Sequence, residues 1–285
     1  MATTKSGATI LEFDQEAIRF REAEVAKETD EGILARLKER FEILTDMTKA
    51  VKAGSVRAMI VSGPPGVGKS YGVESVLENL GTVETLAERK PKYEIVKGAM
   101  SALGLYAKLY EFSEKGNVVV FDDCDSILME DLSLNILKGA LDSSAKRFIS
   151  WNTDSRLLRT EGVPDRFEFR AGAIFITNIK FAHVRSKKLK DHLDALESRC
   201  HYIDLEMDTT REKILHIRQV ITDSGMLDTY DFEPAVRDEI VEFIVSNQND
   251  LRELSLRTVL KVADLKKAFP TRYQAMARTT VMRRA

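Results

Sequence analysis

Five short apolar runs, each the length of one buried strand, alternate along the chain with segments that can form helices. They are RAMIVSG (57–63), YEIVKG (93–98), NVVVFDD (117–123), GAIFITN (172–178) and CHYIDLEM (200–207). Parallel strands need crossover connections, and strands covered on both faces are near-continuous apolar runs. The pattern therefore predicts an α/β fold of three layers, in which a five-stranded parallel sheet lies between two layers of helices.

The segments on either side of this pattern have a different character. A helical stripe of apolar residues covers 32–53, and three segments after the last strand have helical periodicity: 210–223, 234–246 and 254–268. We therefore expect four parts: an N-terminal arm or short helix (1–31), an α/β domain (32–207), a small all-helical domain (208–268) and a basic C-terminal tail (269–285).

Composition narrows the class of protein. Of 285 residues, 44% are hydrophobic and 31% are charged, which is typical of a globular protein with a substantial core. The net charge of −2 gives no global reason to expect nucleic acid binding, so any such reason must be local. Cys124 and Cys200 have no paired spacing, which argues against a disulfide or zinc site. With no leader-like N-terminus and no apolar run of membrane length, we expect a cytoplasmic protein.

The first strand leads into GPPGVGKS (63–70), which fits the pattern Gly-x4-Gly-Lys-Ser and precedes a helix-compatible segment. Glycines in such a loop let successive N–H groups point at phosphate oxygens, and the helix N-terminus adds positive charge. We expect Lys69 to reach the β- and γ-phosphates of a nucleoside triphosphate, and Ser70 to ligate Mg²⁺. The alternative is a chance match in a glycine-rich turn. The residues expected at the nucleotide are Gly63, Pro64, Pro65, Gly66, Val67, Gly68, Lys69, Ser70 and Tyr71.

Two carboxylates end the third apolar run, VVVFDDCDS (118–126), ahead of a helix-compatible segment at 126–142. Ligands of parallel α/β sheets gather at the carboxyl ends of strands. There Asp122 can hold Mg²⁺, and Asp123 can orient or deprotonate an attacking water. The alternative is that these aspartates cap the following helix, for which Asp125 is the better candidate.

A complete extra strand and helix, KYEIVKG and SALGLYAKLYEFSEK, separate the phosphate loop from the acidic strand end. Nucleoside kinases and small GTPases usually lack this insertion, whereas ATP-driven mechanical proteins have it. Over residues 32–268 the chain resembles AAA+ ATPases, including uncharacterised ones of bacteriophages. In that resemblance ITN (176–178) is similar to sensor 1, SRC (198–200) to the arginine-finger motif of sliding-clamp loaders, and LSLRTVLKV to the sensor 2 helix.

The resemblance implies an ATPase that uses Mg²⁺ and works as a ring, a hexamer or a pentamer. Asn178 would position water against the γ-phosphate. Arg199 would act as an arginine finger in the ATP site of the next subunit, where its planar fork spreads charge over phosphoryl oxygens. Its alternative is a surface ion pair with Glu197 or Asp194. Arg257 would be sensor 2, in the first turn of a helix capped by Ser255.

Two departures from the family pattern affect these expectations. The family usually has Asp-Glu at the acidic strand end, and the shorter Asp123 here suggests slow turnover. Protein unfoldases of the family carry an aromatic-apolar-glycine triplet in the loop after the second strand. The corresponding segment, GAMSALGLY (98–106), has no clear match.

Three basic segments bear on what a ring of this kind would act on. They are HVRSKKLK (183–190), the stretch 146–170 with Trp151 and Arg147, Arg156, Arg159, Arg166 and Arg170, and the tail 270–285 with four arginines. Each can follow a phosphate backbone, with Trp151 as a stacking platform for a base. The alternative is that the charges are solvated surface residues and that Trp151 packs in the fold.

The sequence leaves three classes of function open. The first is a DNA-associated motor or loader in replication or recombination, favoured by the SRC tripeptide and the basic tail. The second is a protein-remodelling ring that contacts its client through 98–106. The third is a nucleotide-gated assembly module in which Asp123 does not support turnover. A small-molecule kinase explains neither the extra strand nor SRC.

Overall fold

The computed structural model describes residues 22–86, 92–181, 184 and 186–283. They form two compact units. The sheet unit consists of residues 40–64 and 68–205, and the helical unit of the described residues up to 39, of 65–67 and of those from 206 onward. Most of the predicted arm, together with positions 183, 185, 284 and 285 of the basic segments, lies outside the described residues.

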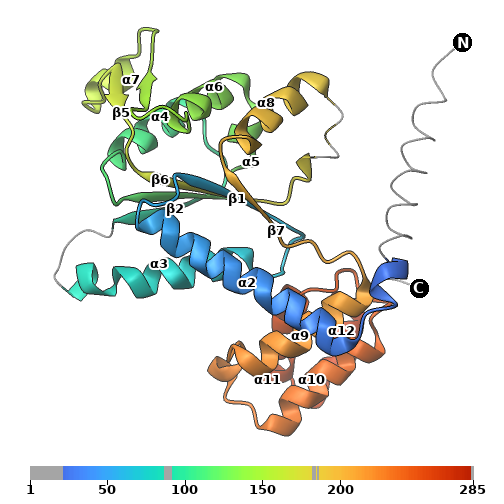
Figure 1. The fold of residues 1–285 in the computed structure, drawn as a ribbon. Helices are drawn as coiled ribbons and strands as arrows, with labels where there is room; N and C mark the ends of the chain where they lie inside the picture. Colours follow the sequence, from blue (N-terminus) through green and yellow to red (C-terminus); the bar gives the residue numbers. More distant parts are fainter. Residues whose placement is uncertain (1–21, 87–91, 182–183, 185, 284–285) are drawn as a thin grey trace, which may run out of the picture. The chain divides into compact units, whose positions relative to one another are not determined.

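All five predicted strands occur in the sheet unit and form one parallel sheet, which confirms the predicted fold class. Its order is β2-β3-β6-β1-β7 (Figure 1). The three interior strands are buried along their whole length, as expected from continuous apolar runs. The strands are β1 (Ala58–Ser62), β2 (Tyr93–Lys97), β3 (Val118–Asp122), β6 (Gly172–Thr177) and β7 (His201–Asp204).

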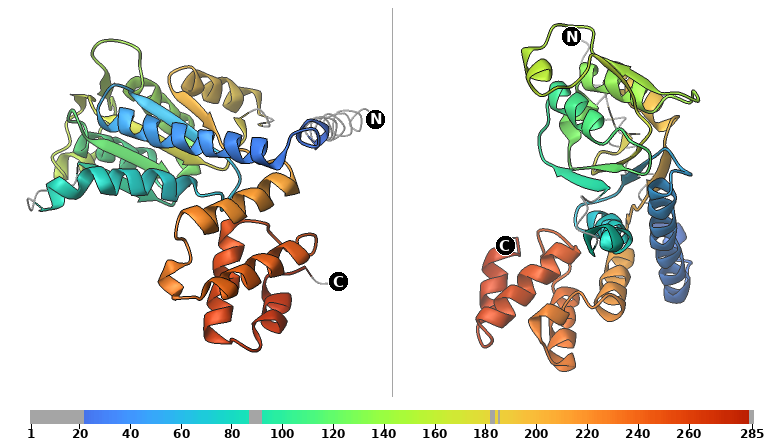
Figure 2. Two further views of the ribbon diagram at one scale, coloured as in Figure 1. Left: turned by 60° about the horizontal axis from the view of Figure 1, so that its bottom comes forward. Right: turned by 90° about the vertical axis from the view of Figure 1, so that its left-hand side faces the viewer.

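Helices cover both faces of this sheet (Figure 1). One face is packed against α4, α6 and α8, and residues of these helices join the strands in the main hydrophobic core. The other face carries α3 and the part of α2 that belongs to the sheet unit, which the two views of Figure 2 show from other directions. The helices are α2 (Asp30–Lys52), α3 (Lys69–Leu86), α4 (Ala102–Glu111), α6 (Asp131–Ala140) and α8 (Lys187–Glu197).

Two local features of the sheet unit differ from the sequence pattern. The segment 126–142 is divided into α5 (Asp125–Met129) and α6, because Glu130 between them has an extended backbone with ψ 124°. Between α6 and β6 the chain forms an antiparallel hairpin of β4 (Phe148–Ser150) and β5 (Arg166–Glu168), with α7 (Arg156–Thr160) between its strands. Strands of three residues are too short to produce a periodic pattern.

The segment 98–106, expected as a loop that would contact a protein client, is mostly helical instead. Ser101 caps α4 by accepting a hydrogen bond from the Gly104 N–H at 3.2 Å. Leu105 and Tyr106 are buried in the main core. Only the residues before Ala102 remain as a loop, so the loop is shorter than 98–106, while the helix predicted for SALGLYAKLYEFSEK is present.

The helical unit is built on three helices at the predicted positions and a fourth that the sequence did not predict. These are α9 (Thr210–Asp223), α10 (Pro234–Ser246), α11 (Leu256–Ala268) and α12 (Tyr273–Thr280), with a short 3₁₀ helix at Asp228–Tyr230. The fourth helix lies within the predicted tail, and its Tyr273 and Ala277 are buried in the core of this unit. The arginines of the segment favour the interpretation as a basic tail, and its apolar stripe is too short to be recognised as a helix from the sequence.

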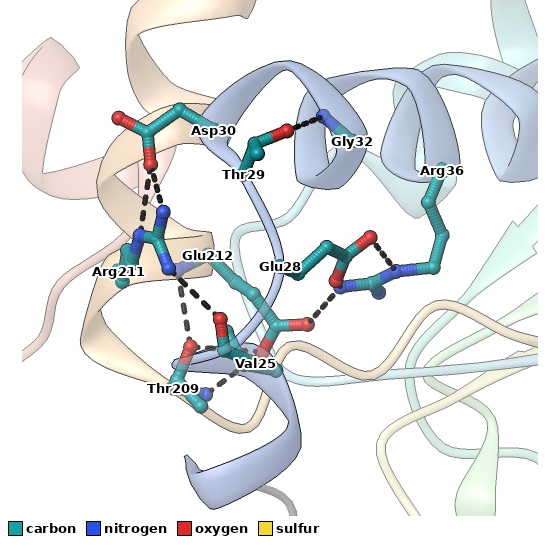
Figure 3. Close-up of polar contacts among 9 residues, drawn as sticks. All are labelled: Val25, Glu28, Thr29, Asp30, Gly32, Arg36, Thr209, Arg211 and Glu212. Carbon is teal, nitrogen blue, oxygen red and sulfur yellow. Dashed lines mark hydrogen bonds and ion pairs between the residues drawn. The ribbon is translucent and has the colours of Figure 1, made fainter.

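The N-terminal residues of the helical unit are held to the start of α9 by charged side chains (Figure 3). Arg211 donates from Nε to Asp30 Oδ1 at 2.8 Å. Arg36 lies between two carboxylates, with Nη2 at 2.9 Å from Glu28 Oε2 and 3.0 Å from Glu212 Oε1. Side chains separated by more than 170 positions in the sequence thus connect α2 and α9.

Among the helices of the described residues, none combines the length and apolar character that crossing a bilayer requires.

Candidate functional site

Three candidate segments leave the same edge of the sheet from neighbouring strands. The phosphate loop follows β1, Asp123 follows β3, and Asn178 follows β6, which lies between the other two. The registers Ser62↔Thr177 and Asp122↔Ile176 bring the three strand ends to the same level. The strand order therefore places Asn178 between the phosphate loop and the acidic residues.

Lys69 is a buried cation whose ammonium group faces backbone carbonyls and one amide. Its Nζ donates to Gly63 O at 2.6 Å, to Pro64 O at 3.0 Å and to Asn178 Oδ1 at 2.8 Å. A lysine has three N–H donors, and its charge makes it attractive to anions. Lys69 thus lies inside the curve of its own loop, where the sequence pattern expects phosphate groups.

Asn178 connects this lysine to the acidic strand end. Its Oδ1 accepts from Lys69, and its Nδ2 donates to Asp123 Oδ1 at 2.9 Å. The contact with the ammonium group fixes which end of the amide is oxygen, because Lys69 can only donate. Both Asn178 and Asp123 are exposed, so water can reach them.

Ser70 and Asp122 form the pair expected to hold a divalent cation. Ser70 Oγ donates to Asp122 Oδ1 at 2.9 Å. Burial raises the pKa of Asp122, while the Ser70 hydroxyl and the nearby Lys97, whose Nζ is 3.8 Å from Asp122 Oδ2, act in the opposite direction. A buried carboxylate beside a hydroxyl fits Mg²⁺, which takes one or two protein oxygens and fills its octahedron with water and phosphate.

The backbone of Asp123 gives a physical reason for an aspartate at this position. Its φ of 53° lies in the left-handed region, which short Asp and Asn side chains tolerate better than longer ones do. The carboxylate is then held by Asn178. The Asp-Asp departure therefore agrees with the local backbone conformation.

Asp125 belongs to this edge in a way that the sequence did not reveal. Its Oδ1 accepts from Thr177 Oγ1 at 2.7 Å, and the same hydroxyl accepts from the Ile179 N–H at 3.0 Å. Asp125 is the first residue of α5 and the cap position belongs to Cys124, so the expectation that Asp125 caps the helix was wrong. The bond joins the ends of β3 and β6 beside Asn178.

The tip of the phosphate loop, Pro65–Val67, groups with the helical unit. Leu256 N–H donates to Gly66 O at 3.0 Å, and His216 Nε2 lies 2.9 Å from Val67 O. A Cβ atom on Gly66 would come within 2.8 Å of the Ser255 side chain, so this approach requires a glycine. Sequence reasoning missed the contacts of His216 and Leu256 with the loop, because nothing in their local pattern indicates a contact about 150 or more positions away.

Of the two predicted arginines, Arg257 lies on α11, whose N-cap is Ser255 as predicted. Its side chain is exposed, and its Cγ would be 3.3 Å from a Cβ on Gly66. Arg199 directly follows α8 and its C-cap Ser198, and its Nη1 donates to Ala195 O at 2.5 Å. The structure thus shows a carbonyl contact for Arg199 rather than the ion pair of the alternative interpretation.

Tyr71, the last residue expected at the nucleotide, is 67% exposed at the start of α3. Its side chain takes no part in the polar contacts that connect Lys69, Asn178 and Asp123. A contribution from this position would come from its backbone near the helix N-terminus.

The basic stretch 146–170 is largely engaged within the fold. Arg147 is buried and donates to Ala140 O and Ala171 O, each at 2.9 Å. Trp151 packs with its ring centroid 5.5 Å from that of Tyr106. Arg159 and Arg170 pair with acids, and Arg166 lies over a phenyl ring: the partners are Asp154, Glu114 and Phe148. These contacts favour the alternative that the residues serve the fold.

The other two basic segments are more open. In the described part of 183–190, Lys188 pairs with Asp131 while Lys187 and Lys190 are exposed. Three arginines of the tail are exposed. Arg272 precedes α12, Arg278 lies within it, and Arg283 follows it. Among the described residues these three arginines form no ion pair, whereas most of the exposed arginines of 146–170 have a partner in the fold.

Comparison with known proteins identifies a relative. No protein-family model matches the chain. A curated protein of Enterobacteria phage T4, described as an uncharacterized 36.7 kDa protein in the nrdC-mobD intergenic region, is 32% identical over 243 residues, which span 85% of this chain and 73% of the phage protein. The chain belongs to the family of this phage protein. The resemblance to uncharacterised bacteriophage proteins is thereby confirmed.

Solved structures with a similar course of the chain have low sequence identity. Domain III of the Thermotoga maritima replication initiation protein DnaA is 15% identical, with a TM-score of 0.47 over 86% of this chain and 91% of that one. NtrX from Brucella abortus, solved in complex with ATP, is 10% identical, with a TM-score of 0.49 over 94% of this chain and 60% of that one.

Proposed function

We propose that this member of the phage family is a Mg²⁺-dependent ATPase of the AAA+ type. The observation that carries the proposal is the hydrogen-bonded series Lys69–Asn178–Asp123, which joins the phosphate loop to the acidic strand end across adjacent strands. A lysine in a glycine-rich loop, a polar amide and a carboxylate at one sheet edge are the groups that nucleotide hydrolysis needs.

Each group has a definite task in this proposal. Lys69 and the loop N–H groups bind the β- and γ-phosphates. Asp123 orients the attacking water and accepts its proton, while Asn178 holds both water and Asp123 in place. Ser70 and Asp122 would hold Mg²⁺, which on binding supplies charge neutralisation at the phosphate oxygens.

The contact between Lys69 and Asn178 suggests how nucleotide would prepare the site. A phosphate oxygen is a stronger partner for an ammonium group than a neutral amide oxygen is. Phosphate at Lys69 would therefore compete with Asn178 Oδ1, and the freed amide could turn toward the γ-phosphate and its water. Asp123 would keep its left-handed backbone throughout, since that conformation does not depend on the amide.

We further propose that the active form is a ring, with Arg199 completing the site of a neighbouring subunit. The residue lies at the end of α8, directly before the edge strand β7 of the sheet. Arg199 donates to the Ala195 carbonyl, a neutral acceptor that a phosphate would readily replace. A hexamer or pentamer follows from the family resemblance.

DNA is the substrate that the described surface supports best. The exposed arginines of the tail, Arg272, Arg278 and Arg283, can follow a phosphate backbone. A protein client is less well supported, because most of 98–106 belongs to a core helix. Between a DNA-associated motor and a remodelling ring, we therefore favour the first.

The test is steady-state ATP turnover measured against protein concentration, with and without single- and double-stranded DNA at moderate salt. A rate per subunit that rises with concentration, and again with DNA, supports a ring that works on nucleic acid. A concentration-dependent rate that ignores DNA shifts the proposal to a protein client. Nucleotide binding with no turnover leaves only the assembly module.

A further inference from the structure

Two residues of the phosphate loop cannot donate from the backbone. Pro64 and Pro65 carry no N–H group, so the tip of the loop offers donors only from Gly66 onward. The direction of each of these N–H groups therefore bears on phosphate binding.

The carbonyl groups at the loop tip determine where two of those N–H groups point. In a trans peptide the C=O of one residue and the N–H of the next are fixed in opposite directions, and none of the described peptide bonds is cis. The Gly66 carbonyl faces the Leu256 N–H at 3.0 Å, so the Val67 N–H points the other way. The Val67 carbonyl faces His216 Nε2 at 2.9 Å, so the Gly68 N–H also points away from α9.

His216 is the side chain in this arrangement, and its chemistry is settled by its partner. A carbonyl oxygen only accepts, so Nε2 carries the proton and donates it to Val67 O. The imidazole is 4% exposed on α9, which leaves little room for the ring to turn away. Both His216 and the tip residues belong to the helical unit.

We propose that His216 is a positioning residue for phosphate binding, which holds the Val67 peptide so that the Gly68 N–H stays directed toward the nucleotide. The Leu256 N–H does the same for the Val67 N–H. The inference rests on the proposed nucleotide binding. It assigns part of the affinity for phosphate to two donors outside the loop.

The test compares variants that keep or remove the donor. His216→Gln retains an N–H near the position of Nε2, whereas His216→Leu fills similar space without one. The matched control is Ile221→Ala, which lowers stability by cutting a buried side chain of the same helix without touching the loop. The measurement is the dissociation constant of a fluorescent ATP analogue with Mg²⁺, beside the thermal midpoint of each variant.

Loss of one hydrogen bond that orders a phosphate donor is expected to weaken binding about threefold to tenfold. His216→Leu should show this loss, while His216→Gln and Ile221→Ala stay within about twofold of the wild type. His216→Leu that binds as tightly as the wild type overturns the inference while leaving the proposed function intact. A wild type that binds no ATP overturns both.

A second pair of variants decides the matter if His216→Leu does not fold. Leu256 is the first residue of α11, where proline is well tolerated, and Ser255 before it is extended with φ −156° and ψ 167°. Leu256→Pro therefore removes the N–H that holds Gly66 O, and Leu256→Ala keeps it while removing the side chain. Weaker binding by the proline variant than by the alanine variant supports the inference, and equal binding refutes it.

Discussion

Replacing Arg36 with methionine should destabilise the helical unit substantially. Glu212 is 1% exposed, and Arg36, at 23% exposed, is the positive charge beside it. Glu212 also accepts from the Thr209 N–H and the Thr209 hydroxyl, each at 3.0 Å, in a capping box at the start of α9. Methionine keeps much of the arginine stem but leaves this buried carboxylate without its cation.

The magnitude follows from burial and from the bonds that remain. Breaking a buried ion pair by removing one partner costs about 3–5 kcal/mol. Arg36 is partly solvated, and Glu212 would keep both bonds from Thr209, so we expect a loss of about 2–3 kcal/mol in the free energy of unfolding.

The pH dependence supplies a second readout. Burial alone would raise the pKa of Glu212, but the Thr209 N–H, the Arg36 guanidinium and the Thr209 hydroxyl outweigh it and hold the pKa below the usual 4.5. Because this folded-state pKa is depressed, Glu212 contributes stability above pH 4.5 that is lost as the pH falls through the folded pKa. Without Arg36 the folded-state pKa of Glu212 moves back toward the unfolded value, so the part of the acid-induced loss of stability that Glu212 supplies should shrink.

Urea unfolding followed by far-UV circular dichroism measures both effects. The matched control is Arg218→Met on α9, the helix of Glu212, since the ion pair of Arg218 with Glu242 is exposed and its loss should cost less than about 1 kcal/mol. Trp151 lies in the sheet unit, so its fluorescence follows that unit separately. If Arg36→Met and Arg218→Met have the same small effect, the buried charge pair does not stabilise the helical unit as reasoned here.

Three further changes test the site. Asparagine is compatible with the left-handed backbone of Asp123, so Asp123→Asn should lower turnover about 10²–10⁴-fold and retain the affinity for ATP. Phosphate release and ATP binding measure the two effects. A variant with normal turnover would show that Asp123 has no part in catalysis. Thr177→Val breaks the bond to Asp125 and should lower kcat about fivefold with little change in KM, since one hydrogen bond worth about 1 kcal/mol positions the β6 end beside Asn178. A changed KM alone would contradict this role. Burial lowers the pKa of His216 below 6.5, so the unfolded chain binds the proton first and stability should fall as pH drops below about 6.5. His216→Gln should remove that part of the pH dependence in urea titrations, and an unchanged slope would refute it.

The sequence was sufficient to predict the sheet and to place the glycine-rich loop after its first strand, because both leave local patterns. Strands buried on both faces are continuous apolar runs, and all five were found. The spacing of the glycine pattern is enough to name Lys69 and Ser70 as the candidate contacts of phosphate and Mg²⁺. The resemblance implied that Asn178 acts beside the phosphate loop, and the order β3-β6-β1 brings it between that loop and the acidic residues.

The remaining features depend on contacts that no local pattern records. His216 meets Val67 across 149 positions of the chain, and a single histidine on an apolar helix face gives no indication of its partner. Asp125 resembled a helix cap because Asp is favoured at cap positions, but Thr177 of β6 donates a hydrogen bond to its carboxylate. The left-handed backbone of Asp123 likewise arises from the turn after β3 rather than from residue type.

The most direct test of the central claim is phosphate release by the wild type in saturating ATP with Mg²⁺, beside Asp123→Asn and Lys69→Ala under the same conditions. The account predicts release by the wild type, binding without release by Asp123→Asn, and loss of binding by Lys69→Ala. Equal rates for the wild type and Asp123→Asn, or ATP binding that survives Lys69→Ala, would contradict it.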